Sequence, residues 1–146
     1  MREILFRGRR LDNSEWVEGI FSYSKWYLNG EFTGEITYYI RPVGTQDAFE
    51  IDVSTAGQYI GLTDKNGNRI FEGDIIKQIW HKSNERDKRS VGKIFFDERN
   101  FAYAAMDVET GEIIPIGRAD ADNWEVERTG NVHENRKPEN ADPKIQ

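Results

Sequence analysis

The sequence contains no cysteine, which excludes disulfide bonds, thiolate zinc sites and cysteine nucleophiles. This composition fits a reducing compartment, and we expect a cytoplasmic protein. Only two histidines occur, His81 and His133, and neither has a second metal ligand at helical spacing. We therefore predict two solvated histidines, no metal centre and no cofactor.

Long hydrophobic runs are also missing. The start, Met1 to Arg7, is charged again after three apolar residues, so we do not expect a signal peptide, and no window approaches the length of a membrane span. Of the 146 residues, 37% are hydrophobic and 32% charged, which is enough for one modest core. We expect one domain over residues 1–135, without a membrane partner, and a mobile tail over residues 136–146.

Short apolar stretches rich in β-branched and aromatic residues predict strands. The first half of the chain has four such stretches: Trp16–Tyr23, Lys25–Leu28, Glu31–Thr33 and Ile36–Ile40. Asn29-Gly30 lies between the second and third, and both of its residues tolerate the positive φ of a type I′ turn, so we expect a hairpin there. Apolar residues never sustain a helical spacing, and at most short helices are expected near Asp52–Gln58 or Gly117–Asn123. The predicted fold is a mostly β, barrel-containing domain, SH3-like or similar, with few short helices.

The glycine-rich run from Gly57 to Ile76 contains a second Asn-Gly pair, at Asn66-Gly67. The stretch from Asp64 to Asn68 has the alternating oxygen ligands of a calcium loop. However, the sixth position of that loop would be Arg69 where a glycine is needed, and the twelfth would be Ile75 where a bidentate glutamate is needed. A hairpin explains the same residues, and we predict a hairpin.

Glu72-Gly73-Asp74 follows this hairpin. Glycine turns the chain and aspartate can accept hydrogen bonds from nearby backbone, so we predict a turn that leads into a barrel strand through Ile79 and Trp80. An active-site role for Asp74 is the less favoured interpretation. The next stretch, His81–Ser90, has no apolar residue and is predicted to be a solvated loop.

The net charge of −6 is unevenly distributed. Bases dominate residues 77–93 and acids dominate residues 101–127, so the two stretches can either pack against each other or join copies of the chain head to tail. The basic stretch supplies a candidate interaction patch: Lys77, Trp80, Lys82, Arg86, Lys88 and Arg89. Bases beside an aromatic residue are typical of single-stranded nucleic acid binders, although a solvated loop or a protein contact fits the same residues.

Three blocks resemble the YopX family, small proteins of bacteriophages and prophages. They are residues 1–19, the run Gly57–Gly67 with Ile70–Ile76, and the closing elements Trp124–Val126 and Gly130–Asn135. The resemblance implies an all-β, barrel-containing fold and expression inside an infected or lysogenic bacterial cell. It implies no reaction and no catalytic residues.

The leading hypothesis is a non-enzymatic phage accessory module that binds an unidentified host or phage protein. Self-association is included, because Trp26, Tyr27, Tyr38 and Tyr39 are more aromatic surface than one modest domain buries. The alternative is a nucleic-acid-binding protein that uses the basic stretch. A carboxylate-dependent hydrolase is the third hypothesis, supported only by dispersed acids; a deep pocket where carboxylates converge on a histidine would favour it.

Overall fold

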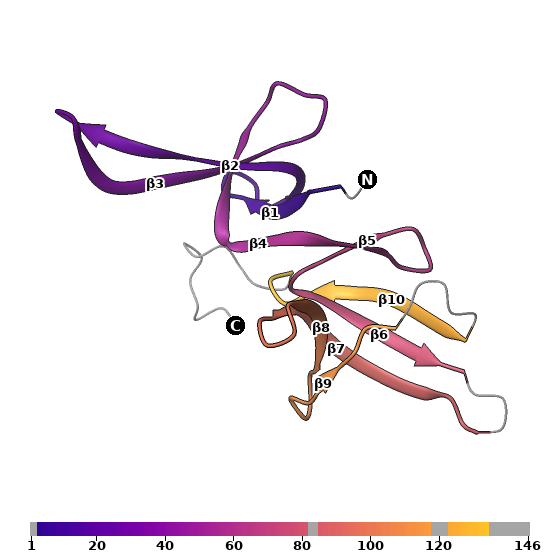
Figure 1. Ribbon diagram of the computed structural model, residues 1–146. Helices are drawn as coiled ribbons and strands as arrows, with labels where there is room; N and C mark the ends of the chain where they lie inside the picture. Colours follow the sequence, from indigo (N-terminus) through magenta and orange to yellow (C-terminus); the bar gives the residue numbers. More distant parts are fainter. Residues whose placement is uncertain (1–2, 82–84, 118–122, 135–146) are drawn as a thin grey trace, which may run out of the picture. The chain divides into compact units, whose positions relative to one another are not determined.

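A computed structural model describes residues 3–81, 85–117 and 123–134, and these residues form strands but no helix (Figure 1). The strands are β1 (Phe6–Arg10), β2 (Trp16–Leu28), β3 (Glu31–Arg41), β4 (Phe49–Thr63), β5 (Arg69–Phe71), β6 (Asp74–Trp80), β7 (Lys88–Asp97), β8 (Ala102–Asp107), β9 (Ile113–Ile114) and β10 (Trp124–Asn131). In the part of the chain so described, no helix is long and apolar enough to cross a membrane.

The chain divides into two compact units, the first ending at Gln58 and the second beginning at Tyr59. Strand β4 contributes its first part to one unit and its last part to the other. The single domain predicted over residues 1–135 stays a prediction, and the predicted tail, residues 136–146, lies outside the described residues.

The first unit contains a closed four-stranded barrel, which confirms the predicted all-β, barrel-containing fold. Each neighbouring pair of β1, β2, β3 and β4 is antiparallel, and β4 returns to pair with β1. Val17, Ile40 and Ile51 are buried at its centre, with Phe6 and Phe21 packed against them. The barrel was expected farther along the chain, at the strand that begins with Asp74; the closed ring instead belongs to the N-terminal unit.

The helix considered for Asp52–Gln58 is wrong, because these residues belong to β4. Arg9 pairs with Asp52 and Arg7 with Gly57 across the β1–β4 ladder. Backbone pairing with a strand more than forty residues earlier in the chain overrides a weak local preference. The other short helix considered was Gly117–Asn123. Its residues 118–122 lie outside the described residues, and Gly117 and Asn123 are not helical.

Beyond the barrel, β2 and β3 continue as a two-stranded hairpin, which we call the arm (residues 20–38; Figure 1). Pairing of β1 with β2 ends at Gly19, and β4 pairs with β3 only at Tyr39 and Ile40. The predicted turn is confirmed: Asn29 has φ 53° and Gly30 φ 83°, as a type I′ turn requires. The two strands predicted after this turn, Glu31–Thr33 and Ile36–Ile40, form one strand, β3.

The second unit is a five-stranded antiparallel sheet in the order β10-β6-β7-β8-β9, with the short hairpin β4–β5. Its buried core consists of Ile60, Ile70, Ile76, Ile94, Ala105, Trp124 and Val126. The strand predicted from Asp74 through Trp80 is confirmed as β6.

The turn before β6 is fixed by the Asp74 carboxylate, which is fully buried. Phe71 donates its backbone N–H to Asp74 Oδ2 at 2.7 Å, and the Asn131 side chain donates to Oδ1 at 2.9 Å. Val132 donates its backbone N–H to the Gly73 carbonyl at 2.9 Å. The predicted backbone bonding by Asp74 is confirmed, and the turn is thereby tied to the end of β10.

The predicted loop His81–Ser90 is too long at its C-terminal end, because Lys88, Arg89 and Ser90 already belong to β7. They pair with Trp80, Ile79 and Gln78 of β6. Charged side chains at the open end of a hairpin stay in water while their backbone extends the ladder, so polarity alone misplaces this boundary.

Candidate functional site

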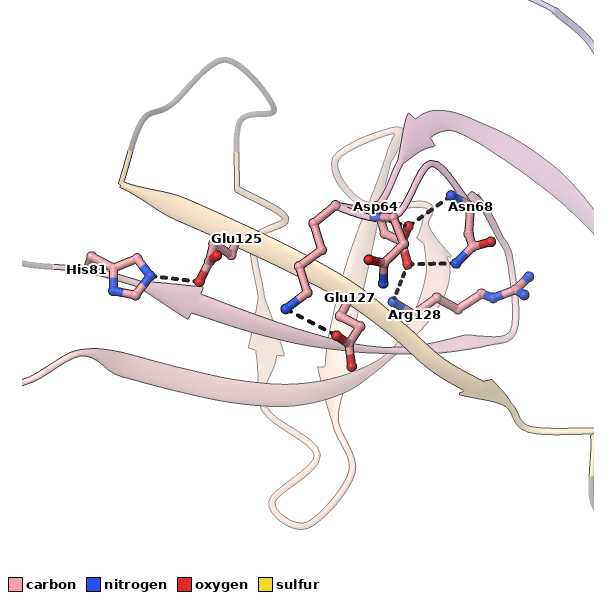
Figure 2. Close-up of polar contacts among 8 residues, drawn as sticks. Asp64, Asn68, His81, Glu125, Glu127 and Arg128 are labelled. Carbon is pink, nitrogen blue, oxygen red and sulfur yellow. Dashed lines mark hydrogen bonds and ion pairs between the residues drawn. The ribbon is translucent and has the colours of Figure 1, made fainter.

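Asp64 is the polar centre of the β4–β5 hairpin, and it is buried although it carries a charge (Figure 2). Its Oδ1 accepts the backbone N–H groups of Asn66 and Asn68, both at 2.9 Å. Its Oδ2 accepts the Asn68 side-chain amide at 3.3 Å and the backbone N–H of Arg128 at 2.9 Å. Both oxygens are thus directed at N–H donors within the fold, and the predicted hairpin is confirmed in place of a calcium loop.

The ionised state of Asp64 is stabilised by these donors. Burial alone raises the pKa of this carboxyl group, but the backbone N–H groups of Arg128, Asn68 and Asn66 together outweigh burial and lower the pKa below its ordinary value. Since Arg128 lies on β10, the charge fastens the turn to that strand. A second bond, from Lys65 N–H to the Val126 carbonyl at 3.0 Å, fastens it again.

The structure separates the members of the predicted patch onto two faces of the sheet. Trp80 and Lys88 are paired residues, with the Lys88 ammonium 5.9 Å from the centre of the Trp80 ring, and Trp80 packs partly against the core. Lys77 is three residues earlier on β6 and therefore points to the opposite face, which Arg89 shares because it pairs with Ile79. Arg86 is exposed in the loop, and Lys82 lies outside the described residues. The patch itself stays a prediction.

The basic and acidic stretches meet within one sheet. Strand β10 places Glu127 opposite Lys77 and Glu125 opposite Ile79. Lys65 forms an ion pair with Glu127 at 3.2 Å (Figure 2). Lys65 lies outside both stretches, so it is the pairing of Lys77 with Glu127 that places the basic and acidic stretches side by side inside the second unit.

His81 lies between two carboxylates, an arrangement that the sequence did not reveal. Its Nε2 is 2.8 Å from Glu125 Oε2, and its Nδ1 is 3.0 Å from Asp87 Oδ2. Ionised carboxylates only accept hydrogen bonds, so this arrangement favours the protonated imidazole, in which both ring nitrogens donate. The bond to Glu125 and the charge of Asp87 accordingly raise the pKa of His81, and the bond from His81 lowers the pKa of Glu125.

This cluster is a surface ion pair in geometry. Both ring nitrogens of His81 are partnered by carboxylates, and the side chain is partly exposed. The nearby depression, lined by Lys65, Lys77, Ile79, Glu125, Val126 and Glu127, encloses about 20 Å³, which is room for about one water molecule. Within residues 3–81, 85–117 and 123–134, no group of three or more His, Asp or Glu side chains is placed to hold a metal ion.

One side of the arm carries a row of aromatic rings, which we call the aromatic face (Phe21, Tyr23, Tyr27, Phe32 and Tyr38); Tyr23, Tyr27 and Phe32 are exposed, and Phe21 and Tyr38 pack partly against the barrel core. Its rings contact one another in two groups: Tyr38 lies 6.0 Å from Phe21 and 6.5 Å from Tyr23 between ring centres, and Tyr27 lies 5.8 Å from Phe32. The Lys25 ammonium lies 5.6 Å from the centre of the Phe32 ring. Phe21 also contacts Phe6 of the barrel core at 5.3 Å.

Two of the four aromatic residues singled out in the sequence, Tyr27 and Tyr38, lie on this face. Trp26 points to the other side, where its indole N–H donates to the Thr37 hydroxyl at 2.7 Å. Tyr39 pairs with Ser22 and Glu50, and it shares the side of Trp26. Tyr23 and Phe32 were not among the four, although the period of two along the predicted strand Trp16–Tyr23 already places Tyr23 on the same face as Phe21.

These observations define the class of the protein: an all-β chain with a barrel, an exposed aromatic arm and a buried polar turn. The comparisons agree with it: the model of the YopX protein family matches residues 5–138, so the chain belongs to the YopX family. No match was found among curated proteins.

Proposed function

We propose that this YopX chain is a non-enzymatic accessory module of a bacteriophage or prophage, acting in the cytoplasm of the bacterial host. Its task is to bind a macromolecule, and the aromatic face of the arm is the contact surface. The observation that carries the proposal is the row of exposed rings on a hairpin with no third strand beside it among the described residues.

The exposure of these rings is large. Tyr23 is 57% exposed, Tyr27 60% and Phe32 47%, and every residue from Ser22 to Glu35 is exposed. A two-stranded hairpin is at best marginally stable in water, and it gains stability by packing a face against something else. Tyrosine and phenylalanine also supply much of the binding energy at protein interfaces because they bury a large area with few rotatable bonds.

The charge of the arm favours a protein over a nucleic acid at this surface. Lys25 is the single base between Ile20 and Tyr38, whereas Glu31 and Glu35 lie at and near the tip. Phosphate backbones are held by several bases acting together and are repelled by carboxylates. A host or phage protein is therefore the proposed partner.

Capture from the lysate of infected host cells tests the proposal. The full chain is immobilised, and captured proteins are identified by mass spectrometry for the natural sequence and for the double variant Tyr27→Ser, Phe32→Ser. We expect the variant to lose at least about tenfold of the captured partner, since two buried rings are worth more than about 1.4 kcal/mol.

Phe101→Ser is the matched control, because Phe101 is 83% exposed but lies in the second unit. Circular dichroism of all variants confirms that they remain folded. A partner that is retained by the arm variant and lost by Phe101→Ser would show that the contact surface was assigned to the wrong unit.

A second candidate is nucleic acid binding through the basic stretch, which the pairing of Lys88 with Trp80 supports. Affinity for single- and double-stranded oligonucleotides at low salt is compared between the natural chain and the variant with Lys82, Arg86, Lys88 and Arg89 changed to alanine. Removing several phosphate contacts would weaken binding and flatten its salt dependence. Binding that is absent, or unchanged in the variant, contradicts this candidate.

A further inference from the structure

No strand in the described part of the chain pairs with the outer edge of β2 along the arm. Strand β1 pairs with β2 from Trp16 to Gly19 and then ends, so from Ile20 to Leu28 the only strand paired with β2 among the described residues is β3, on the other side. An unpaired edge presents a row of backbone N–H and C=O groups to any strand that can align with it.

The two edges of the arm differ in how they are protected. On β3, pairing is irregular between Ile36 and Phe32: the four-residue step on β3 faces a two-residue step on β2, and Gly34 within it has φ 89°. A bulge with a positive-φ glycine bends a strand and blocks further pairing. The segment Ile20–Leu28 contains no glycine and no proline, and Lys25 is its only charged residue.

We propose that the β2 edge pairs with the β2 edge of a second copy of this chain, antiparallel and about a two-fold axis at Ser24. Ser24 is the midpoint of the free segment, so this register uses its full length. The two arms then form one four-stranded sheet in the order β3-β2-β2-β3, with the aromatic faces of both copies on the same side. This inference goes beyond the proposed function, because the second copy occupies the edge of β2 and the aromatic faces of both copies stay open to a host or phage protein.

The sequence of the edge is complementary to itself in this register. The pairs across the interface are Ile20 with Leu28, Phe21 with Tyr27, Ser22 with Trp26, Tyr23 with Lys25, and Ser24 with Ser24. Directly opposed side chains decide how well two antiparallel strands pair, and aromatic or aliphatic pairs are the favourable ones.

The single base on the edge also fits. Lys25 lies opposite a tyrosine ring, a favourable contact for a cation, and it avoids its own copy, which a register centred on Lys25 would place directly opposite. At the axis itself, the two small serine side chains allow the backbones to approach to sheet distance. An isologous contact of this kind closes after two copies and does not continue into a fibre.

An engineered cysteine tests the register directly, because the chain has none of its own. Residues facing each other at a two-fold axis have Cα atoms about 4.5–5.5 Å apart, within the range of a disulfide. We expect Ser24→Cys to form a covalent dimer under mild oxidation. In Ser22→Cys, the two thiols are offset by four residues, or about 13 Å, and do not react. Equal cross-linking of both variants, or preferential cross-linking of Ser22→Cys, overturns the proposal.

A charge at the axis gives a second measurement that needs no oxidation. Ser24→Lys places two like charges directly opposite each other, whereas Ser22→Lys places the same charge opposite Trp26, on the same strand and side. Sedimentation over a concentration series gives the dissociation constant of the dimer. We expect this constant to rise about fivefold in Ser24→Lys and to change little in Ser22→Lys. A chain that is monomeric throughout, or dimers that respond equally, overturns the pairing.

The two proposals fail in different ways. If the natural chain is monomeric but its aromatic face still captures a host or phage protein, the self-pairing is wrong and the proposed function stands. If it pairs at Ser24 and the Tyr27→Ser, Phe32→Ser variant captures the same proteins as the natural chain, the register stands and the proposed contact surface is wrong.

Discussion

Two hairpins in this protein turn on the same dipeptide and end in different situations. The β2–β3 hairpin turns at Asn29-Gly30 and is exposed from Ser22 to Glu35. The β4–β5 hairpin turns at Asn66-Gly67 and is fastened to β10 through Asp64. The Asn-Gly dipeptide therefore determines that the chain turns back on itself. The residues around each turn determine whether the hairpin packs into the fold or stays exposed.

The backbone of the two turns differs as well. Asn29 has φ 53°, whereas at Asn66-Gly67 only the glycine has positive φ. The first turn is a two-residue loop, and the second is a three-residue loop in which Asp64 N–H donates to the Asn68 carbonyl at 2.8 Å. The same Asn-Gly dipeptide thus adopts two different backbone conformations, and only the first requires a positive φ at the asparagine.

Removing the fastening carboxylate is expected to have the largest effect. Asp64→Ala leaves the N–H groups of Arg128, Asn66 and Asn68 without their acceptor in a part-buried site. We expect the free energy of unfolding to fall by about 3 kcal/mol, measured by urea denaturation. Asp107→Ala is the control, because Asp107 accepts similar N–H bonds from Glu109 and Thr110 but at an exposed turn, where water replaces the lost acceptor and a clearly smaller loss of stability is expected.

The same carboxylate predicts a dependence on pH. The pKa of Asp64 is lower in the folded protein than its ordinary value of 3.8, so its contribution is present above that value and is lost as the pH falls through the folded pKa. The difference in stability between the natural chain and Asp64→Asn should narrow below about pH 4. A difference that stays constant down to pH 2 would mean that the charge of Asp64 is irrelevant.

Alanine at the two turn asparagines distinguishes the hairpins directly. Asn29→Ala forces alanine into a left-handed conformation and should cost about 1 kcal/mol, seen as faster hydrogen exchange of the arm amides. Asn66→Ala meets no such strain, and we expect almost no change. Equal effects at both positions would contradict the difference between the turns.

The smallest effect is expected at His81. Its folded pKa is raised by Glu125 and Asp87, so it stabilises the fold at low pH, and this contribution is lost as the pH rises through the folded pKa. Glu125→Gln should move the pKa of His81, measured by NMR titration, back toward 6.5. The group is exposed, and high salt should weaken the shift. A pKa that is unchanged in Glu125→Gln would rule out the contact.

Much of the fold follows from local patterns. The type I′ turn at Asn29-Gly30, the strand from Asp74 and the hairpin at Asn66-Gly67 were all predictable, because each depends on residues next to one another in sequence. The ring closure between β1 and β4 and the sheet partner of Asp52–Gln58 depend on pairing over long sequence distances, which composition does not encode.

The candidate site was predictable only in part. Tyr27 and Tyr38 were identified because aromatic residues are conspicuous, and the basic stretch because its charge is. Asp87 and Glu125 meet at His81 only because β10 lies beside β6. Glu125 is 44 residues from His81 in the sequence. Sequence spacing gives no signal for such a cluster.

The strand β2 has a mechanical consequence. It is a single strand with Val17 in the barrel core near one end and Tyr27 at the tip of the arm near the other, and its pairing with β3 runs from Ile20 to Leu28 with one irregularity, between Lys25 and Tyr27. Any load applied at the tip along β2 is therefore carried by shear of the β2–β3 hydrogen bonds directly to the barrel wall. No glycine or proline interrupts β2 between Ile20 and Leu28, so the place where the arm can bend under such a load is the bulge at Gly34 on β3.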